Sequence, residues 1–542
     1  MLQGVAGSET GPESWFLTAA ERGNPATRID ERRGDGRPWT AGNRVEILVH
    51  GATYFGRLLD VVEGLGEGDQ LYFTDWRGDH DERLSDGHQT TVGECFAAAA
   101  RRGVSVKGLL WRSHGDLAGF STRENRHLGD MVNAAGGEVL LDMRIRLVGS
   151  HHQKLVIVRR AGRTDTDAAF VGGIDLCNGR RDGDKHLGDP QRLKMPPVYG
   201  PTPPWHDVQV EIQGPAVGDL EFTFRERWTD PTPLSSGLVR VAQALRRRIQ
   251  RPGSQLPAMP ADPPPAGTHS IQVLRTYGRP RRGYPFAPDG ERSIARAYLK
   301  AVRRARRLIY IEDQFLWSDD VVASFADALK EFPRLQIVAV VPRYFDQAGL
   351  FKWPSQIGRE QAMKSLLEAG GDRVGIYDIE NSEGTPVYVH AKVCVIDDVW
   401  AAVGSDNFNR RSWTHDSEVS CAVLDEARDS REPHDPSGLG DGGRVFARDL
   451  RLRLWREHLD RGEGDDGDLV EPLQATQTFR DAAEALERWH QAGGLGQRPP
   501  GRLRPHQRVR PPRTALLWAE PMYRLLYDPD ARPRAMRKAG LW

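Results

Sequence analysis

Two neighbouring runs of the sequence, HAKVCVID at residues 390–397 and GSDNFNRRSWTHDSE at residues 404–418, place charged, amide and hydroxyl side chains among valines and small residues. His390 and Lys392 lie two positions apart, so on a β-strand their side chains point to the same face. The apolar residues 393–396 that follow predict a buried strand. The pattern therefore predicts a strand that presents an imidazole and an ammonium group side by side.

The same pattern occurs earlier in the chain. His152 and Lys154 precede an apolar run at 155–158, and a later apolar run leads to Gly172 and Gly173. A single histidine on a strand is most often a core residue with its hydrogen bonds satisfied, but chance poorly explains the recurrence of the whole ordered pattern. Two copies predict a pseudo-symmetric pair of lobes with one site between them.

At these residues the chain resembles the phospholipase D superfamily, whose signature His-x-Lys-x-x-x-x-Asp occurs in two copies. The segment from His390 to Asp397 fits the signature completely, whereas the copy that begins at His152 has Arg159 in place of the final Asp, which is usually structural in the family. The resemblance covers roughly residues 40–460. Three further segments resemble the phospholipid-cleaving members: GGIDLC at 172–177, WHD at 205–207 and IYIEDQ at 309–314.

The resemblance implies an α/β fold of two pseudo-symmetric lobes, each a mixed, mostly parallel sheet flanked by helices, with one active site between them. Predicted strands and helices alternate along both halves, as such a fold requires. The resemblance also implies a phosphoric diester hydrolase that converts phosphoglycerides to phosphatidic acid and a free head group through a phosphohistidine, with transphosphatidylation as an added capacity. Three alternatives stay open: a cardiolipin synthase-like phosphatidyltransferase, a nuclease or DNA-end phosphodiesterase, and a non-catalytic phosphate-binding scaffold.

Cleavage of an anionic phosphodiester requires positive charge at the non-bridging oxygens and a proton for the leaving group. Lys154 and Lys392 are the candidates for the positive charge, and Asn407 is a candidate hydrogen-bond donor. One histidine would attack phosphorus while the other serves as acid and then base. The resemblance makes His152 the nucleophile and His390 the acid/base, an order that the sequence by itself leaves open.

Acidic and small residues complete the candidate site. The resemblance gives Asp207 and Asp416 the part of fixing the tautomers of the two histidines, with Glu418 as the alternative to Asp416. No carboxylate cluster with hard-metal spacing accompanies the His-x-Lys pairs, so neither a metal nor another cofactor is expected. The candidates for substrate binding are Asn407, Ser405, Gly173, Asp175 and Glu418.

Composition limits the classes of partner. The 542 residues carry no formal net charge, so charge gives no support to a nucleic-acid partner. The first residues lack the features of a secretory signal, and no stretch approaches the roughly 20 apolar residues of a membrane span. The four cysteines lack metal-ligand spacing. We therefore expect a soluble, monomeric protein that is cytoplasmic or peripheral to a membrane and meets phospholipid at the membrane surface.

Composition also divides the chain. Residues 178–202 are rich in Gly, Pro and charge, and they predict a long loop over the mouth of the site. Residues 494–513 combine low hydrophobicity with many arginines and are predicted to be extended or disordered. The predicted segments are an irregular lead-in (1–40), a first lobe (41–230), a Pro/Arg-rich linker (231–266), a second lobe (267–460), and a C-terminal helix with an Arg/Pro-rich tail (461–542).

Overall fold

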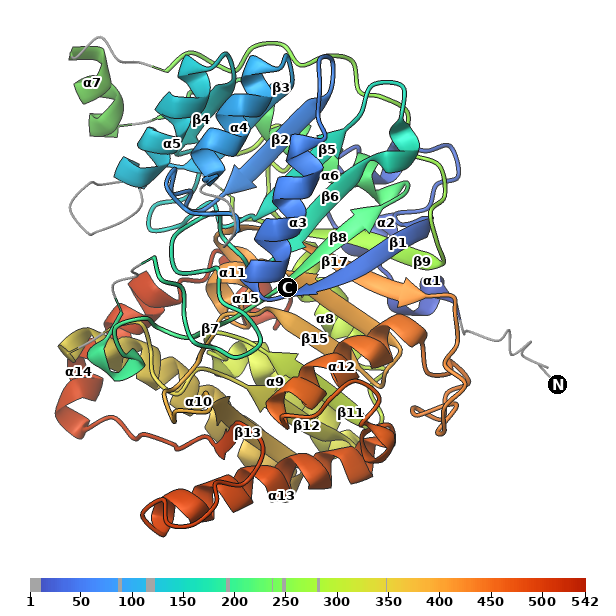
Figure 1. Ribbon diagram of the computed structural model, residues 1–542, viewed down its shortest axis with the longest axis vertical. Helices are drawn as coiled ribbons and strands as arrows, with labels where there is room; N and C mark the ends of the chain where they lie inside the picture. Colours follow the sequence, from blue (N-terminus) through green and yellow to red (C-terminus); the bar gives the residue numbers. More distant parts are fainter. Residues whose placement is uncertain are drawn as a thin grey trace.

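Within the described residues, the strands of both halves form one mixed sheet of 16 strands (Figure 1). The N-terminal half lies above the C-terminal half in the view of Figure 1, and helices cover both faces of the sheet. The computed structural model describes residues 11–85, 90–113, 122–191, 195–235, 237–245, 250–279, 283–347 and 349–542.

In the described part of the first half, the strands neighbour one another in the order β1-β8-β6-β5-β2-β3-β4. The strands are β1 (Thr40–Val49), β2 (Gln70–Asp75), β3 (Ser105–Trp111), β4 (Glu138–Asp142), β5 (Leu155–Arg159), β6 (Ala168–Gly172) and β8 (Val208–Gln213). The helices are α3 (Gly51–Glu63), α4 (Val92–Arg101) and α5 (Thr122–Ala134) on one face and α6 (Ala216–Trp228) on the other.

The described second half repeats this arrangement in the order β9-β17-β16-β15-β11-β12-β13. The strands are β9 (His269–Tyr277), β11 (Leu308–Glu312), β12 (Gln336–Val340), β13 (Val374–Ile379), β15 (Val393–Ile396), β16 (Trp400–Gly404) and β17 (Ser417–Asp425), with β10 (Glu291–Arg292) paired to β9. The helices are α8 (Ser293–Val302), α9 (Asp319–Glu331) and α10 (Lys352–Gly370) on one face and α12 (Val445–His458) on the other.

The matching strand orders confirm the predicted α/β class with two pseudo-symmetric lobes. In each half the three outermost of these strands are parallel, and the strands nearer the centre are antiparallel. Strands β1 and β9 pair in antiparallel fashion and join the halves. A separate small sheet pairs β7 (Trp205–His206) with β14 (Tyr388–Val389), one strand from each half.

One hydrophobic core lies across both halves. Side chains of α6 and α12 pack on the same face of the sheet, and Phe224, Trp228, Leu454 and Trp455 belong to this shared core. Strands β5 and β15 are buried along their whole length because helices cover both faces. That burial explains why both strands are continuous apolar runs rather than alternating ones.

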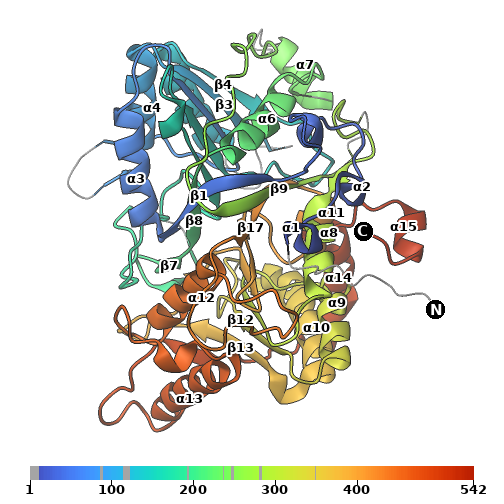
Figure 2. The same ribbon diagram turned by 90° about the vertical axis from the view of Figure 1, so that its right-hand side faces the viewer.

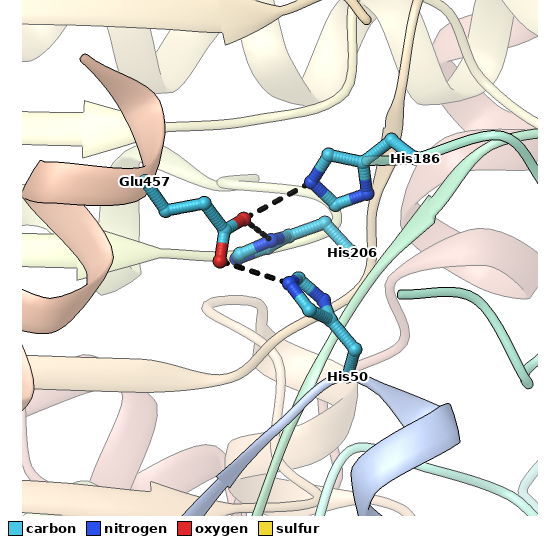
Figure 3. A group of neighbouring side chains, drawn as sticks. All are labelled: His50, His186, His206 and Glu457. Atoms are coloured by element: carbon cyan, nitrogen blue, oxygen red, sulfur yellow. Dashed lines mark hydrogen bonds and ion pairs between the residues drawn. The ribbon is translucent and has the colours of Figure 1, made fainter. Parts of the chain in front are cut away.

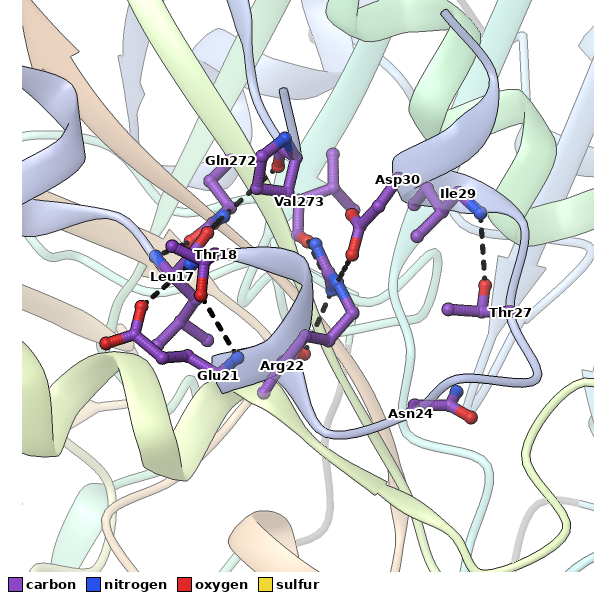
Figure 4. A network of polar contacts seen from close by, with 12 residues as sticks. Leu17, Thr18, Glu21, Arg22, Asn24, Thr27, Ile29, Asp30, Gln272 and Val273 are labelled. Atoms are coloured by element: carbon purple, nitrogen blue, oxygen red, sulfur yellow. Dashed lines mark hydrogen bonds and ion pairs between the residues drawn. The ribbon is translucent and has the colours of Figure 1, made fainter. Parts of the chain in front are cut away.

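The segment before β1 is docked on the second half. It contains the short helices α1 (Pro12–Trp15) and α2 (Ala19–Arg22). Arg22 is buried, and its Nε lies 2.7 Å from Asp30 Oδ2 while its Nη1 donates to Val273 O of β9 at 3.1 Å (Figure 4). The described part of the predicted lead-in is therefore ordered by contacts with the centre of the sheet.

The chain after residue 460 packs along the second half (Figure 2). Strand β18 (Leu503–Pro505) pairs with β13, at the edge of the sheet. Arg498 and Arg504 lie 3.3 and 3.2 Å from the carboxylate of Glu380. Within residues 494–513, Leu503–Pro505 form a strand, and the ion pairs of Arg498 and Arg504 hold the segment to the second half. The helices of this segment are α13 (Pro472–Gln491), α14 (Arg513–Met522) and α15 (Arg534–Lys538).

Arg159, which departs from the His-x-Lys signature, has its own buried partners. Its Nε lies 3.2 Å from Asp167 Oδ2 and 3.3 Å from Glu221 Oε2. Its guanidinium also donates to Ala261 O in the linker, which contains α7 (Gly237–Leu245). In the second copy, Asp397 instead accepts three backbone N–H groups, from residues 306–308. The two copies thus hold opposite charges at this position, and both have structural roles.

Two sequence-based expectations concern membrane-spanning helices and the cysteines. Across the described ranges, no helix combines the length and the apolar character that crossing a bilayer would require. All four cysteines are buried free thiols. The cytoplasmic location and the monomeric state stay predictions.

Candidate active site

The two His-x-Lys segments lie in matching positions, each beside an acidic segment of the opposite half. His390 N donates to His206 O at 2.8 Å, alongside the parallel pairing of β14 with β7. In the same way, His152 N donates to Ser417 O at 2.8 Å. In each case the residue that follows the acceptor is acidic, so each histidine lies next to a carboxylate of the other half.

His390 is held by Asp207 of the first half. Its Nδ1 lies 2.7 Å from Asp207 Oδ2, and both side chains are buried. The ring of Trp205 packs against the imidazole, with 4.9 Å between centroids. Because the Nδ1 of His390 is engaged with a carboxylate, Nε2 is the nitrogen left for reaction.

His152 is held by Glu418 of the second half. Its Nδ1 lies 3.0 Å from both Glu418 Oε2 and Ser405 O. The carboxylate of Glu418 accepts the hydroxyls of Ser405 and Ser412 at 2.6 and 2.8 Å, which fix its position. The His152 side chain is 14% exposed. Because each half supplies the acidic partner for the histidine of the other half, neither half can form the site by itself.

The prediction that Asp416 partners a histidine is corrected by this geometry, which gives that position to Glu418. Asp416 instead accepts Ser150 N at 2.9 Å and the Ser150 hydroxyl at 3.1 Å. Its carboxylate also forms an ion pair with Arg411 at 2.8 Å. Asp416 therefore fastens the turn before His152 and does not contact the imidazole through a hydrogen bond.

Strand register explains why the acidic partner is Glu418. In the first half, Gly172 of β6 pairs with Gln209 of β8. In the second half, Gly404 of β16 pairs with Ser420 of β17. Counting back two residues from these partners leads to Asp207 and to Glu418. An acid followed by valine occurs at both places, and that local signal distinguishes Glu418 from Asp416 in the sequence.

The two lysines differ in their charge environment. Lys154 Nζ lies 2.9 Å from Asp175 Oδ1. Burial by itself would lower the pKa of Lys154, but Asp175 and then Asp75 raise it above its ordinary value. Lys392 donates to His390 O, and burial lowers its pKa to about 8 although Asp207 and Asp313 oppose this. The asymmetry follows from the neutral Asn407, which stands where the first half has Asp175.

The remaining predicted binding residues lie around the lysines. Among the described residues, the buried side-chain oxygen of Asn407 meets no hydrogen-bond donor. Asp175 also meets Arg180 of the predicted mouth loop at 3.4 Å. Burial would raise the pKa of Asp175, but Lys154 and Arg180 hold it below its ordinary value. At neutral pH, Asp175 is therefore an anion whose charge is balanced by Lys154 and Arg180.

Gly173 and Ser405 occupy equivalent positions with different consequences. A Cβ added at Gly173 would lie 2.1 Å from Asp207 Oδ1, so only glycine lets this carboxylate reach His390. In the second half the equivalent Ser405 donates its hydroxyl to Glu418. Gly173 therefore makes room for Asp207, and Ser405 holds Glu418 in position.

Two carboxylates outside the predicted set also belong to the site. Asp75, at the end of β2, accepts Leu176 N at 3.1 Å. Asp313, directly after β11, accepts Phe408 N at 2.9 Å. Leu176 and Phe408 follow the equivalent residues Asp175 and Asn407, so the two acids fix both loops in the same way. Their common position at the carboxyl ends of equivalent strands is the signal that could have identified them.

The protonation states suit a nucleophilic imidazole. Burial and Lys154 lower the pKa of His152 well below its ordinary value. Burial, with the charge of Asp416, raises the pKa of Glu418 to about 8. Burial and Lys392 lower the pKa of His390. Both imidazoles are therefore neutral before an anionic ligand arrives, and a ligand between the lysines would supply the negative charge that favours protonation of His390.

Comparisons with known proteins match both halves of the chain. A family described as phospholipase D matches residues 80–277, and one described as cardiolipin synthase, PLD-like domain, matches residues 298–431. Each match contains one His-x-Lys pair.

Curated relatives extend the match. Phospholipase D gamma 2 of Arabidopsis thaliana is 26% identical, with 72% of this chain and 60% of the relative covered. Phospholipase D alpha 1 of Cynara cardunculus is 27% identical, with 70% of this chain and 59% of the relative covered. The chain thus spans about 60% of the length of these relatives.

Among solved structures, a phosphatidylserine synthase of Haemophilus influenzae Rd KW20 is similar with a TM-score of 0.48 and 12% identity, over 70% of this chain and 82% of that one. At this TM-score the likeness is too weak to support a conclusion about function.

Proposed function

Because the chain belongs to the phospholipase D superfamily, we propose that it is a phosphodiesterase that hydrolyses phosphoglycerides to phosphatidic acid and a free head group. The observation that carries this proposal is that each histidine has its acidic partner in the opposite half. His152 meets Glu418 of the second half, and His390 meets Asp207 of the first. Two imidazoles with fixed tautomers and two buried lysines are the parts that a two-step displacement at phosphorus requires.

In the first step, the lone pair on His152 Nε2 attacks phosphorus and forms a P–N bond. The P–O bond to the head group breaks, and protonated His390 gives its Nε2 proton to the departing oxygen. The lysines neutralise the non-bridging oxygens as negative charge moves onto them. Because His152 becomes cationic when the P–N bond forms, its charge favours the ionised form of Glu418, which in turn stabilises the phosphohistidine.

In the second step, water takes the place of the head group. His390, now neutral, accepts a proton from the water, whose oxygen attacks phosphorus. The P–N bond breaks, the electron pair returns to His152 Nε2, and phosphatidic acid leaves. An alcohol can replace water without any other change, so the same residues support transfer as well as hydrolysis.

Exposed apolar side chains support a lipid substrate over a nucleic acid. Several exposed apolar side chains within one short segment favour contact with an apolar partner. The C-terminal segment that carries these side chains is joined to the site through Arg411. This arginine donates to Tyr527 O of the segment at 3.2 Å and also to Asp416. The exposed apolar residues on α14 and the turn that follows it are Leu516, Leu517, Trp518, Leu525 and Leu526.

A phosphatidyltransferase is the second candidate. The match of residues 298–431 to a cardiolipin synthase-type domain favours it. Its chemistry is the same through the phosphohistidine and differs only in the acceptor, which would be a lipid alcohol such as phosphatidylglycerol. The product formed from mixed phospholipids separates the two candidates, since the hydrolase yields phosphatidic acid and the transferase a diphosphatidyl lipid.

Ethanol should intercept the intermediate. Added to a phosphatidylcholine reaction, it should yield phosphatidylethanol at the expense of phosphatidic acid, because both acceptors compete for one phosphohistidine. Choline release should change little if formation of the intermediate limits the rate. Lipid products and choline are measured together, with single-stranded DNA as a parallel substrate.

A substrate chiral at phosphorus supplies the control, because two inversions give net retention of configuration. Inversion, together with no alcohol product at any ethanol concentration that preserves activity, would show direct attack by water. Cleavage of the DNA in place of the lipid would overturn the assignment of the substrate.

The pH profile should reflect Lys392. Its pKa is lowered to about 8, so the cationic form that binds phosphate is present below this pH and is lost as pH rises through it. We expect kcat/KM for a soluble diester to fall above about pH 8. The corresponding fall in kcat should lie at higher pH, because a bound phosphodiester favours the charged lysine. A kcat/KM that stays level well above pH 8 would exclude Lys392 as the cation.

A further inference from the structure

Three histidines converge on one glutamate (Figure 3). His50 follows β1, His186 belongs to the long loop at 178–202, and His206 ends β7, so all three come from the first half. Glu457 comes from α12 of the second half. The distances from its carboxylate oxygens are 2.8 Å to His50 Nε2, 3.0 Å to His186 Nε2 and 3.3 Å to His206 Nδ1.

We propose that these four side chains bind one divalent transition-metal ion, with Zn²⁺ as the best fit. Their ligand atoms all lie within 4.8 Å of one another. In a tetrahedral site with Zn–N bonds of about 2.0–2.1 Å, ligand atoms are about 3.3 Å apart. The contacts with Glu457 are already close to this spacing, and the most widely separated ligand atoms would need to approach one another by at most about 1.5 Å.

The outer hydrogen bonds of two histidines direct lone pairs toward the centre. His186 Nδ1 donates to Trp205 O at 3.1 Å, which leaves the lone pair of Nε2 facing Glu457. His206 Nε2 lies 2.7 Å from Glu312 Oε2, which leaves its Nδ1 facing Glu457. A metal-binding histidine almost always donates its other N–H to a carboxylate or a backbone carbonyl, as these two do.

Hydrogen bonding leaves part of the cluster unpaired. Among the described residues, the buried Nδ1 of His206 has no hydrogen-bond partner of good geometry, even though Glu457 is near. The three rings are packed with centroids 4.8, 5.2 and 5.6 Å apart. Imidazolium ions at these distances would repel one another in a buried place, whereas one dication satisfies three neutral imidazoles and a carboxylate together.

The donor set selects the kind of ion and its role. Imidazole nitrogens suit Zn²⁺ and neighbouring transition metals, while Mg²⁺ and Ca²⁺ prefer oxygen. Four protein ligands and strong burial are typical of structural sites, whereas catalytic zinc keeps an open position. The ion would therefore take no part in the displacement at phosphorus, and the inference does not depend on the reaction that the protein catalyses.

The position of the cluster suggests what the ion stabilises. His206 directly precedes Asp207, the partner of His390, and His50 N donates to Asp207 O at 2.9 Å. The ion would fasten this segment of the first half to Glu457 of the second. The metal site would thus hold the lobes in the register at which Asp207 reaches the other lobe's histidine.

The test is the metal content of the full chain, purified without a metal-binding tag and measured by plasma mass spectrometry. We expect about one equivalent of zinc per chain. His186→Gln and Glu457→Gln should each lower the retained metal at least about tenfold. His490→Gln is the matched control, because it removes another histidine paired with a glutamate, Glu380 at 2.7 Å, and it should retain the ion.

Two measurements on the wild type keep the inference testable if the variants do not fold. Removal of the ion with a chelator should lower Tm, and Zn²⁺ should restore it. Co²⁺ introduced into the same protein should give the visible absorption of a four-coordinate site. A folded wild type with far less than one equivalent of metal, and no binding of added Zn²⁺ or Co²⁺, would overturn the proposal. Equal metal in the wild type and both ligand variants would also overturn it.

Discussion

His152→Ala should lower kcat/KM on the order of 10⁴-fold or more, because no other group can form the P–N bond. His390→Ala should lower it about 10²–10⁴-fold, the usual contribution of a positioned acid/base. Both variants should keep a wild-type Tm within a few degrees. The measurement is turnover of phosphatidylcholine, with His490→Ala as the control for loss of a histidine that is paired with Glu380 and has no contact with either catalytic histidine.

A second substrate separates the two roles. A diester with a nitrophenolate leaving group needs no proton in the first step. It should therefore restore much of the first-step rate of His390→Ala and none of that of His152→Ala. If either variant keeps more than about 10% of the wild-type rate with the natural substrate, that histidine does not participate. Rescue of His152→Ala in place of His390→Ala would reverse the assigned order.

Glu418→Gln should lower kcat about 10²–10⁴-fold, whereas Asp416→Asn should change it less than about tenfold. When the P–N bond forms, the His152 ring becomes cationic and favours the ionised form of Glu418, whose opposing charge a neutral amide cannot supply. Asp416 is joined to Ser150 and Arg411, so its replacement should act mainly on Tm. Steady-state kinetics and thermal unfolding of both variants make the comparison.

Asp207→Asn supplies the internal reference, because Asp207 occupies the matching place beside His390. It should resemble Glu418→Gln in its loss of kcat. The reverse outcome, in which Asp416→Asn loses turnover and Glu418→Gln retains it, would mean that the acid beside His152 is not the one that supports the reaction.

The sequence by itself determined the repeat and the identity of its polar residues. His152 and Lys154, like His390 and Lys392, share a strand face because side chains alternate with a period of two, which is a local property. The apolar runs after them became buried strands for an equally local reason, since continuous apolar strands need cover on both faces. The two-lobed α/β fold follows from the repetition of these elements.

Partners in the site depended on tertiary structure, because they come from different halves. Asp416 and Glu418 share a strand face, and only the pairing of Gly404 with Ser420 puts Glu418 in the place that Asp207 has in the other half. The difference between the two lysines likewise becomes visible only when Asp175 is seen in contact with Lys154. Neither relation can be obtained from spacing, since the intervening segments differ in length.

The partners of several other charged residues and histidines likewise could not be predicted from the sequence. Arg159 is compatible with a buried strand because Asp167 and Glu221 meet it from a turn and from α6. The arginine-rich residues 494–513 were predicted to be extended or disordered. In the structure, β18 pairs with the edge strand β13, and Arg504 forms an ion pair with the buried carboxylate of Glu380. The histidines around Glu457 are spread from residue 50 to residue 206 and carry no recognisable spacing. The fold of the first half brings the three histidines together, and the antiparallel junction of β1 and β9 joins this half to the second half, which supplies Glu457.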